Sequence, residues 1–183
     1  MIDQKNQENY KEQEICVSCG FCCDGTLFGR ATLGASEKEG LPELMSRSYS
    51  KYGDVESFKL PCGYFEEKCT IYDKKKAAVC SSYRCRLLKD FSAGRLSFLG
   101  AIKVIENAQK MRFEIMANYS EVFGFSNKVY FKEILRNIGK GSRPEIVSGQ
   151  DIEYELFVAQ CNIFETLLIR HFREPDEFDF MLV

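Results

Sequence analysis

Hydrophobic side chains recur at helical spacing in the second half of the chain, and this pattern predicts four helices there. The first begins near Ser81, where Cys85, Leu88 and Phe91 are spaced for one face of a helix. Gly94 supplies its stop signal, because glycine adopts the left-handed conformation that ends many helices. We therefore expect Cys85 to lie on a helix face.

A longer amphipathic helix is predicted over roughly residues 97 to 118. Charged side chains lie mostly opposite its apolar stripe, as expected for a helix that faces a core on one side only. The stripe consists of Phe98, Ala101, Ile105, Ala108 and Ile115, and the opposite face of Lys103, Glu106, Lys110 and Glu114.

Two further helices are predicted before the C-terminus. One is shorter, is built on Val129, Ile134, Leu135 and Ile138, and is closed by Gly139. The last begins after a capping pattern of Ser148 with Asp151 and runs until Pro175. Its apolar stripe comprises Leu156, Phe157, Cys161, Phe164, Leu168 and Phe172.

The first half of the chain lacks this periodicity. Residues 1–14 are polar and predict a solvated lead or a short exposed helix, and residues 16–25 combine cysteines with small residues and predict a loop. Residues 26–61 are rich in glycine and proline and predict loops with a short strand pair, and residues 60–73 predict a small hairpin. Each predicted helix must bury its apolar stripe, so the helices should form the core on which these loops rest.

These elements predict a mainly α fold in which a loop-rich, metal-organised N-terminal half packs on a C-terminal helical bundle. We divide the chain into a polar lead (1–15), a cysteine-cluster region (16–91) and a helical scaffold (92–183). With 183 residues and 45% hydrophobic content, the chain is large enough to build a core without disulfides.

The distribution of the cysteines indicates what chemistry the chain could perform. Eight of the nine cysteines fall between residues 16 and 85. No secretory signal or membrane-spanning run is evident, so we expect a soluble, cytoplasmic protein with no membrane partner. In a reducing cytoplasm a dense set of cysteines indicates metal or redox chemistry rather than disulfides.

The spacing of the cysteines favours metal binding. The eight candidate ligands are Cys16, Cys19, Cys22, Cys23, Cys62, Cys69, Cys80 and Cys85. The first four form a CxxCxxCC run, and its doubled two-residue spacing also occurs in loops that hold iron-sulfur clusters. Thiolates are soft donors that suit zinc, copper(I) and iron-sulfur clusters, and we favour an iron-sulfur cluster over zinc.

The number and pairing of the sites stay open. Eight thiols suffice for two four-thiolate zinc sites, for a four-iron cluster with a second metal, or for one cluster with spare redox thiols. Because adjacent side chains diverge, one of Cys22 and Cys23 should serve a different site from Cys16 and Cys19. Lys68, Arg84 and Arg86 flank ligands, where they would either offset the negative charge of the thiolates or serve as solubilising surface charge. The Lys74–Lys76 run predicts a solvated turn.

The remaining candidate groups predict structural roles. Cys161 lies on an apolar stripe, where a buried thiol is more usual than a ligand. His171 is the only histidine, which excludes sites that need two, and its place near a helix C-terminus favours compensation of the helix dipole. A net charge of -2 gives no electrostatic footprint for nucleic acid, so we expect no nucleic-acid partner.

The order of these motifs resembles the CxxCxxCC family of zinc- or iron-chelating proteins, also called YkgJ-type cysteine cluster proteins. The resemblance covers roughly residues 16–91 and includes Cys69-Thr-Ile-Tyr72-Asp and Tyr83-Arg-Cys85. Where such proteins often have Arg-Pro after the tyrosine, this chain has a lysine run. The resemblance implies metal chelation by the eight cysteines, and a distant relation to flagellin lysine methylases implies an enzyme hypothesis.

Three hypotheses of function therefore compete. The first is a cytoplasmic metal-binding protein that holds an iron-sulfur cluster or zinc, with the metal ion or cluster as its partner. The second is a structural zinc module whose helical surface binds another protein. The third is a metal-dependent enzyme of protein methylation or electron transfer, in which a ligand position is open. A disulfide-stapled protein without metal is the remaining alternative.

Overall fold

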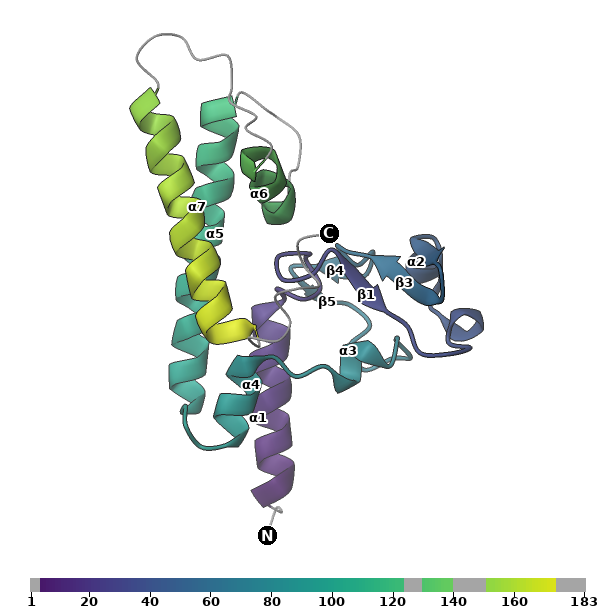
Figure 1. Cartoon of the computed structure of the whole chain (residues 1–183). Helices are drawn as coiled ribbons and strands as arrows, with labels where there is room; N and C mark the ends of the chain where they lie inside the picture. Colours follow the sequence, from purple (N-terminus) through teal and green to yellow (C-terminus); the bar gives the residue numbers. More distant parts are fainter. Residues whose placement is uncertain (1–3, 124–129, 140–150, 174–183) are drawn as a thin grey trace.

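The protein is described from a computed structural model, in which residues 4–123, 130–139 and 151–173 are placed well enough for description (Figure 1). Within these ranges the fold is mainly α, as the sequence predicts. The helices are α1 (Gln4–Cys19), α2 (Glu43–Ser46), α3 (Val79–Ser82), α4 (Arg86–Ser92), α5 (Phe98–Phe123), α6 (Phe131–Gly139) and α7 (Asp151–Phe172). A single 3-10 turn, Lys38–Gly40, precedes α2 in the described part.

Two long antiparallel helices, α5 and α7, form the main body of the molecule, and α1 and α4 pack beside one end of the pair (Figure 1). The amide of Asn118 on α5 donates to the side-chain oxygen of Gln160 on α7 over 2.8 Å. The predicted apolar stripes fill the space between these helices, since Ile105, Ile115 and Phe164 are almost fully buried. Burial of these stripes confirms the long amphipathic helix and the last helix.

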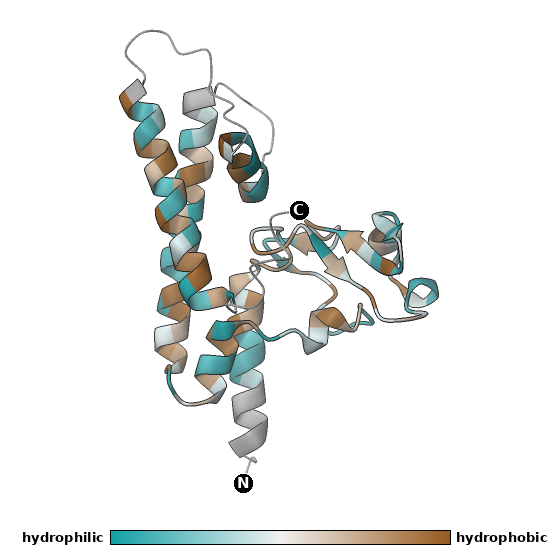
Figure 2. Ribbon diagram, viewed as in Figure 1, coloured by the Kyte–Doolittle hydropathy of each residue, from teal (hydrophilic) through white to brown (hydrophobic). Residues whose placement is uncertain are grey.

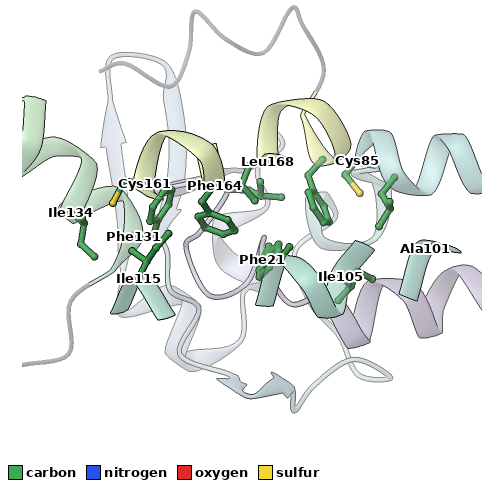
Figure 3. Packing of buried hydrophobic residues seen from close by; sticks show 14 of the residues in the cluster. Phe21, Cys85, Ala101, Ile105, Ile115, Phe131, Ile134, Cys161, Phe164 and Leu168 are labelled. Atoms are coloured by element: carbon green, nitrogen blue, oxygen red, sulfur yellow. The ribbon is translucent and has the colours of Figure 1, made fainter. Parts of the chain in front are cut away.

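Aromatic packing ties the N-terminal loop to this helical core. The ring of Phe21 lies 5.3 Å from that of Phe172 and 6.3 Å from that of Phe164, both in edge-to-face arrangement. Figure 3 shows Phe21 among the side chains of this cluster, together with Cys85, Phe164 and Leu168. The buried ring of Phe21 therefore holds the loop that follows α1 against the helical core.

A small antiparallel sheet lies to one side of the helices, with the strand order β1-β3-β2. Its strands are β1 (Arg30–Thr32), β2 (Tyr49–Tyr52) and β3 (Val55–Lys59). Phe58 on the central strand pairs with Ala31 on one side and Tyr49 on the other, and its side chain is buried. The predicted strand pair is thus part of a three-stranded sheet, because β1 adds a third strand.

The predicted hairpin over residues 60–73 is confirmed. It consists of β4 (Phe65–Glu66) and β5 (Lys68–Cys69), which pair in antiparallel register. Its apolar side chains and those of the sheet form a second hydrophobic cluster, which contains Leu33, Met45, Phe58, Leu60, Cys62, Ile71 and Ala77. The molecule therefore has one core between helices and another beneath the sheet and hairpin.

The helix predicted from Ser81 to Gly94 is two helices. Tyr83 and Cys85 are extended, with ψ of 130° and 165°, and they separate α3 from α4. Gly94 has φ of 69° and its amide donates to the carbonyl of Phe91, so it ends α4 as predicted.

The later helices agree with the sequence predictions except at one side chain. The short helix predicted to end at Gly139 is α6, while Val129 and the capping residue Ser148 lie outside the described residues. Leu156, which we assigned to the buried stripe of the last helix, is 65% exposed. In the hydropathy colouring of Figure 2, hydrophobic residues recur along the length of α7. No helix in the described ranges is both long and apolar enough to cross a bilayer.

Candidate metal centre

The first two candidate ligands lie on a helix and not in a loop, which corrects our expectation for residues 16–25. Residues 4–14 are rich in Glu, Gln and Lys, which favour helix, and α1 continues through Cys16 to Cys19. Gly20 ends it with φ of 69°, and its amide donates to the carbonyl of Cys16 over 3.3 Å. A three-residue spacing on a helix places Cys16 and Cys19 on one face.

The end of α1 is held by α5. The amide nitrogen of Gln109 donates to the carbonyl oxygens of Ser18 and Cys19, over 2.7 Å and 3.3 Å. These carbonyls belong to the last turn of α1, which lacks partners within its own helix. Gln109 therefore fixes the helix end that carries Cys19, a role that no pattern in the sequence predicts.

The next two cysteines lie in a tight turn between the two cores. Cys22 packs against the helical core, whereas the carbonyl of Cys23 accepts a hydrogen bond from the amide of Cys62 over 2.8 Å. The amides of Cys23 and Asp24 both donate to the carbonyl of Gly20, at 2.8 Å and 2.9 Å. The backbone of Cys23 is thus joined to the hairpin region and that of Cys22 follows the buried Phe21.

The hairpin and the segment after it supply three candidate ligands. Cys62 is buried in the second cluster, and Cys69 and Cys80 pack against it. The carbonyl of Cys62 accepts from the amide of Phe65 over 3.0 Å, which bends the chain into β4. The amide of Cys80 donates to the carbonyl of Ala77 over 3.0 Å at the start of α3.

Cys85, predicted on a helix face, instead occupies the N-cap position of α4. Its backbone is extended, and its carbonyl accepts from the amide of Lys89 over 3.0 Å, which begins the helix. The residue is buried in the helical core, beside Leu87 and Leu88. This thiol lies near those of Cys16 and Cys19 on α1, whose pKa values it raises.

The thiols of Cys16, Cys19, Cys22 and Cys85 form one group, which we call the helix-side group. Burial raises the pKa of Cys22 well above its usual range, and the nearby Cys19, Cys85 and Cys16 raise it further. Burial and proximity to Cys85 and Cys16 likewise raise the pKa of Cys19. The four members are therefore mutual neighbours, although they come from three separate segments.

The thiols of Cys23, Cys62, Cys69 and Cys80 form the hairpin-side group. Burial raises the pKa of Cys23 far above its usual range, and the nearby Cys69, Cys16, Cys80 and Cys62 add to the effect in that order. Burial, with Cys62 and Cys69 nearby, raises the pKa of Cys80 to about 11. Cys16 is also close to Cys69 and Cys23, so the two groups adjoin. This division assigns Cys22 and Cys23 to different groups, although Cys23 also raises the pKa of Cys22, so their service in different sites stays a prediction.

The eight cysteine side chains lie in one region but do not converge on a common metal position. Among residues 4–123, 130–139 and 151–173, no three or more His, Cys, Asp or Glu side chains are arranged as a site for a metal ion. The structure joins none of the nine cysteines by a disulfide. It therefore brings all eight predicted ligands into one region but does not show a coordination geometry.

The cation nearest the thiols is Lys76, which we had placed in a solvated turn. Burial and the thiols of Cys85 and Cys69 raise the pKa of Cys16 to about 11, and Lys76 acts in the opposite direction. It also lowers the pKa of Cys80. Its ammonium donates to the carbonyl of Tyr72 and lies 4.6 Å from the centroid of that ring. Lys74 and Lys75 are exposed, so the prediction holds for them.

The three cations that we predicted to flank the ligands are exposed. Arg84 pairs with Glu12 on α1, and Ser92 hydrogen-bonds the same carboxylate, which ties α1 to the start and end of α4. Arg86 lies 3.9 Å from Asp90. Arg84 thus links α1, which carries Cys16, to the segment that carries Cys85, whereas the pair of Arg86 and Asp90 lies within α4.

Two further polar groups next to the thiols were not found from the sequence. The pKa of Tyr72 is raised to about 12 by burial and by the proximity of Cys16, Asp73, Cys69 and Cys23, so its hydroxyl lies beside both groups. Asp24 is 7% exposed and lies 3.3 Å from a guanidinium nitrogen of Arg112 on α5. Burial raises the pKa of Asp24, and Arg112 and the amide of Thr26 partly offset that rise.

Cys161 and His171 lie where the sequence predicts. Cys161 is fully buried between α7 and its neighbours, and its pKa is raised to about 12 by burial and by Glu165. His171 is in the last turn of α7, the position in which a protonated imidazole would offset the helix dipole, although burial and nearby arginines lower its pKa.

No protein-family model, no curated protein and no solved structure matches the chain.

Proposed function

We propose that this chain is a metal-binding protein that holds an iron-sulfur cluster or zinc through its eight clustered cysteines. The observation that carries the proposal is the gathering of eight thiols, from segments up to 69 positions apart between Cys16 and Cys85, into two adjoining groups of four. Four thiolates complete the coordination of one zinc ion or one iron-sulfur cluster. Two groups of four thiols are compatible with two such sites.

The donor set fits these metals. Every candidate ligand is a thiol, and the lone histidine lies at the end of α7. Sulfur donors select zinc, copper(I) and iron-sulfur clusters over magnesium and calcium. We prefer an iron-sulfur cluster, as the doubled spacing of the first three cysteines favours it.

The raised pKa values of six candidate thiols support a metal as the cation that would balance their negative charge. Burial raises the pKa of Cys16, Cys19, Cys22, Cys23, Cys62 and Cys80, which favours their protonated form, and Lys76 opposes this effect at Cys16 and Cys80. A bound cation reverses this balance, because it deprotonates the thiols that coordinate it. The protein's own contribution is to bury the thiols, hold them in two groups and offset their charge.

We further propose that the chain belongs with the CxxCxxCC cysteine-cluster proteins and works in the cytoplasm. The order of the eight cysteines supports the first statement. The second rests on the reduced state that the thiols require, since disulfides persist mainly in oxidising compartments.

The proposal is tested by metal and acid-labile sulfide analysis of protein purified without oxygen from iron-replete cells, together with its visible absorption spectrum. Iron with sulfide and a brown colour would identify a cluster, and stoichiometric zinc in a colourless protein would identify a zinc site. A protein that contains no metal as purified, and that takes up none on reconstitution, would contradict the proposal.

Matched variants assign the metal to the cysteines. Cys19→Ser and Cys23→Ser each remove one member of a different group, so each should lower the metal content of its own site. Cys161→Ala should leave the metal content unchanged, because Cys161 lies apart from both groups in the helical core. Equal metal loss in all three variants would show that the loss comes from general unfolding.

A further inference from the structure

Helix α7 has a second apolar stripe, on the side opposite its buried one. Ile152, Leu156 and Ile163 are 73%, 65% and 60% exposed, and Ala159 between them is exposed as well. Their positions alternate by four and three residues, which keeps them on a single face of a helix. The other face follows the same alternation and carries the buried residues Phe157, Cys161, Phe164 and Leu168. We call the exposed set, Ile152, Leu156, Ala159 and Ile163, the outer stripe.

Helix α5 shows what a solvated helix face looks like in this protein. Its exposed face also begins with an apolar residue, Leu99, and includes Phe113. Between these two, the positions at the same spacing are the exposed Lys103, Glu106 and Lys110, which is the usual composition of a surface stripe. The outer stripe of α7 has no charged residue over its four positions. An uninterrupted apolar seam at this spacing is typical of a helix that packs against another helix.

Charge along α7 selects the orientation of a partner. Glu153 and Glu155 are exposed next to Ile152, and Arg170, which continues the outer stripe, is exposed near the other end. Two copies of α7 in parallel would place arginine beside arginine and glutamate beside glutamate. Two antiparallel copies would place Arg170 of each copy within about one helical turn of Glu153 and Glu155 of the other, where opposite charges attract.

We propose that the outer stripe binds a second copy of this chain through antiparallel pairing of the two α7 helices. A two-fold axis between Ala159 and Ile163 makes the patch self-complementary, because Ala159 of each copy then faces Ile163 of the other. The small alanine lets the helices approach closely. One helix face buries less area than the roughly 1,200 Å² of a standard interface, so the dimer should be transient and concentration-dependent. This inference goes beyond the proposed metal binding and does not depend on it.

Sedimentation velocity of the full chain, over a concentration series under reducing conditions, tests the dimer. The weight-average mass should rise with concentration for the wild type, and Ile163→Glu should shift the midpoint at least about tenfold to higher concentration. Phe113→Glu is the matched control, since it puts the same charge at another exposed apolar position, on α5. Leu156→Glu serves as a second test if Ile163→Glu does not fold, as judged by its helical circular dichroism.

Charge reversal tests the orientation. Arg170→Glu should weaken an antiparallel dimer, because it adds a third negative charge beside Glu153 and Glu155 of the second copy. The double change Glu153→Arg with Arg170→Glu should restore part of the affinity. In a parallel dimer Arg170→Glu would only replace arginine beside arginine by glutamate beside glutamate, so an unchanged affinity in this variant would indicate parallel pairing and overturn the proposal. A wild type that stays monomeric throughout, or an equal effect of Phe113→Glu, would overturn it too.

Discussion

The ring of Phe65 lies directly against the Cα of Gly20, so that a Cβ at residue 20 would come within 2.7 Å of its Cε2 atom. Gly20 ends α1, and Phe65 begins the first strand of the hairpin. This contact brings the helix that carries Cys16 and Cys19 against the element that leads to Cys69. The absence of a side chain at residue 20 is therefore a condition for the two groups of thiols to adjoin.

Gly20→Ala should destabilise the protein by about 2–3 kcal/mol, measured by urea unfolding under reducing conditions. A left-handed alanine costs roughly 1 kcal/mol, and displacement of the Phe65 ring adds the rest. Gly53→Ala separates the two effects, because Gly53 also has positive φ but no atom within 4 Å of the added Cβ. It should cost only about 1 kcal/mol. Equal losses in the two variants would show that the Phe65 contact contributes nothing.

The ion pair between Asp24 and Arg112 predicts an unequal response to removal of its two members. Arg112→Met leaves a buried carboxylate whose hydrogen bonds come from the amide and side chain of Thr26, and should cost roughly 2 kcal/mol, since the arginine is itself partly exposed. Asp24→Asn keeps an oxygen for Thr26 and removes the buried charge, so it should cost less.

The pH dependence of the Arg112→Met variant checks this interpretation. Burial raises the pKa of Asp24 in the folded protein, so this carboxyl is least costly when it is protonated. The cost of Arg112→Met exists while Asp24 is ionised and should shrink as the pH falls through its folded-state pKa. A difference in unfolding free energy that stays constant from neutral to acidic pH would contradict the assignment.

Comparison of sequence and structure shows why some features could be predicted. Ile105, Ile115 and Phe164 were placed correctly because helical spacing determines which side chains share a face. The α1 helix was missed at Cys16 because glycine and serine near the cysteines indicated a loop, whereas the helix-forming residues before them continue the helix to Gly20. The local sequence pattern does not show which of these two tendencies prevails at Cys16.

The candidate site shows the same limit at longer range. Spacing predicted eight ligands, but not their division, which depends on where the hairpin and α4 place Cys69 and Cys85. A run of lysines usually lies in solvent, and the sequence therefore predicted that Lys76 is solvated. Its contact with the ring of Tyr72 depends on how the chain bends between the two residues, which spacing does not show. Leu156 was assigned to the core because α7 has two apolar stripes, and spacing cannot tell which of them is covered.

Lys76 should contribute to metal retention if the proposed function is correct. Its ammonium offsets negative charge near Cys16 and Cys80, so Lys76→Met should weaken metal binding by about threefold to tenfold in competition with a chromogenic chelator. Lys74→Met removes the same charge from an exposed position two residues away and should have little effect. A similar loss in both variants would mean that only the net charge of the region matters.

Lys132 on α6 predicts a stability effect with a defined pH window. Burial and the nearby Arg173 and Arg136 lower its pKa to about 8. At neutral pH the charged form is thus disfavoured in the folded state, and Lys132→Met should stabilise the protein. Between about pH 8 and pH 10 the unfolded chain binds more protons at this residue, so its contribution to stability rises with pH.

The difference in unfolding free energy between Lys132→Met and wild type should therefore shrink from pH 7 to pH 9.5. Titration of the cysteines over the same range is common to both proteins and cancels in the difference. Lys103→Met, at an exposed position on α5, provides the control and should show no such trend. A stabilisation by Lys132→Met that is independent of pH would assign it to packing and not to charge.

If the proposed function is correct, removal of the metal should loosen one part of the molecule and leave another folded. The second hydrophobic cluster is small and is flanked by the hairpin-side thiols, whereas α5 and α7 bury the extensive cluster around Ile115 and Phe164. Structural zinc supplies about 10–16 kcal/mol of apparent binding energy in small domains, comparable with the whole stability of many proteins. Loss of that energy should therefore unfold the segment between Cys62 and Cys80 first.

Hydrogen exchange before and after treatment with a chelator under reducing conditions measures this effect. Amides of β4, β5 and α3 should lose protection, while those in the middle of α5 and α7 should keep it, because their hydrogen bonds lie within helices packed by the larger core. Cys161→Ala should not reproduce the pattern, since it leaves the proposed ligands intact and creates only a small cavity between α7 and its neighbours. Uniform loss of protection over both regions would show that the metal stabilises one cooperative unit, and no loss in either region would contradict a structural role for the metal.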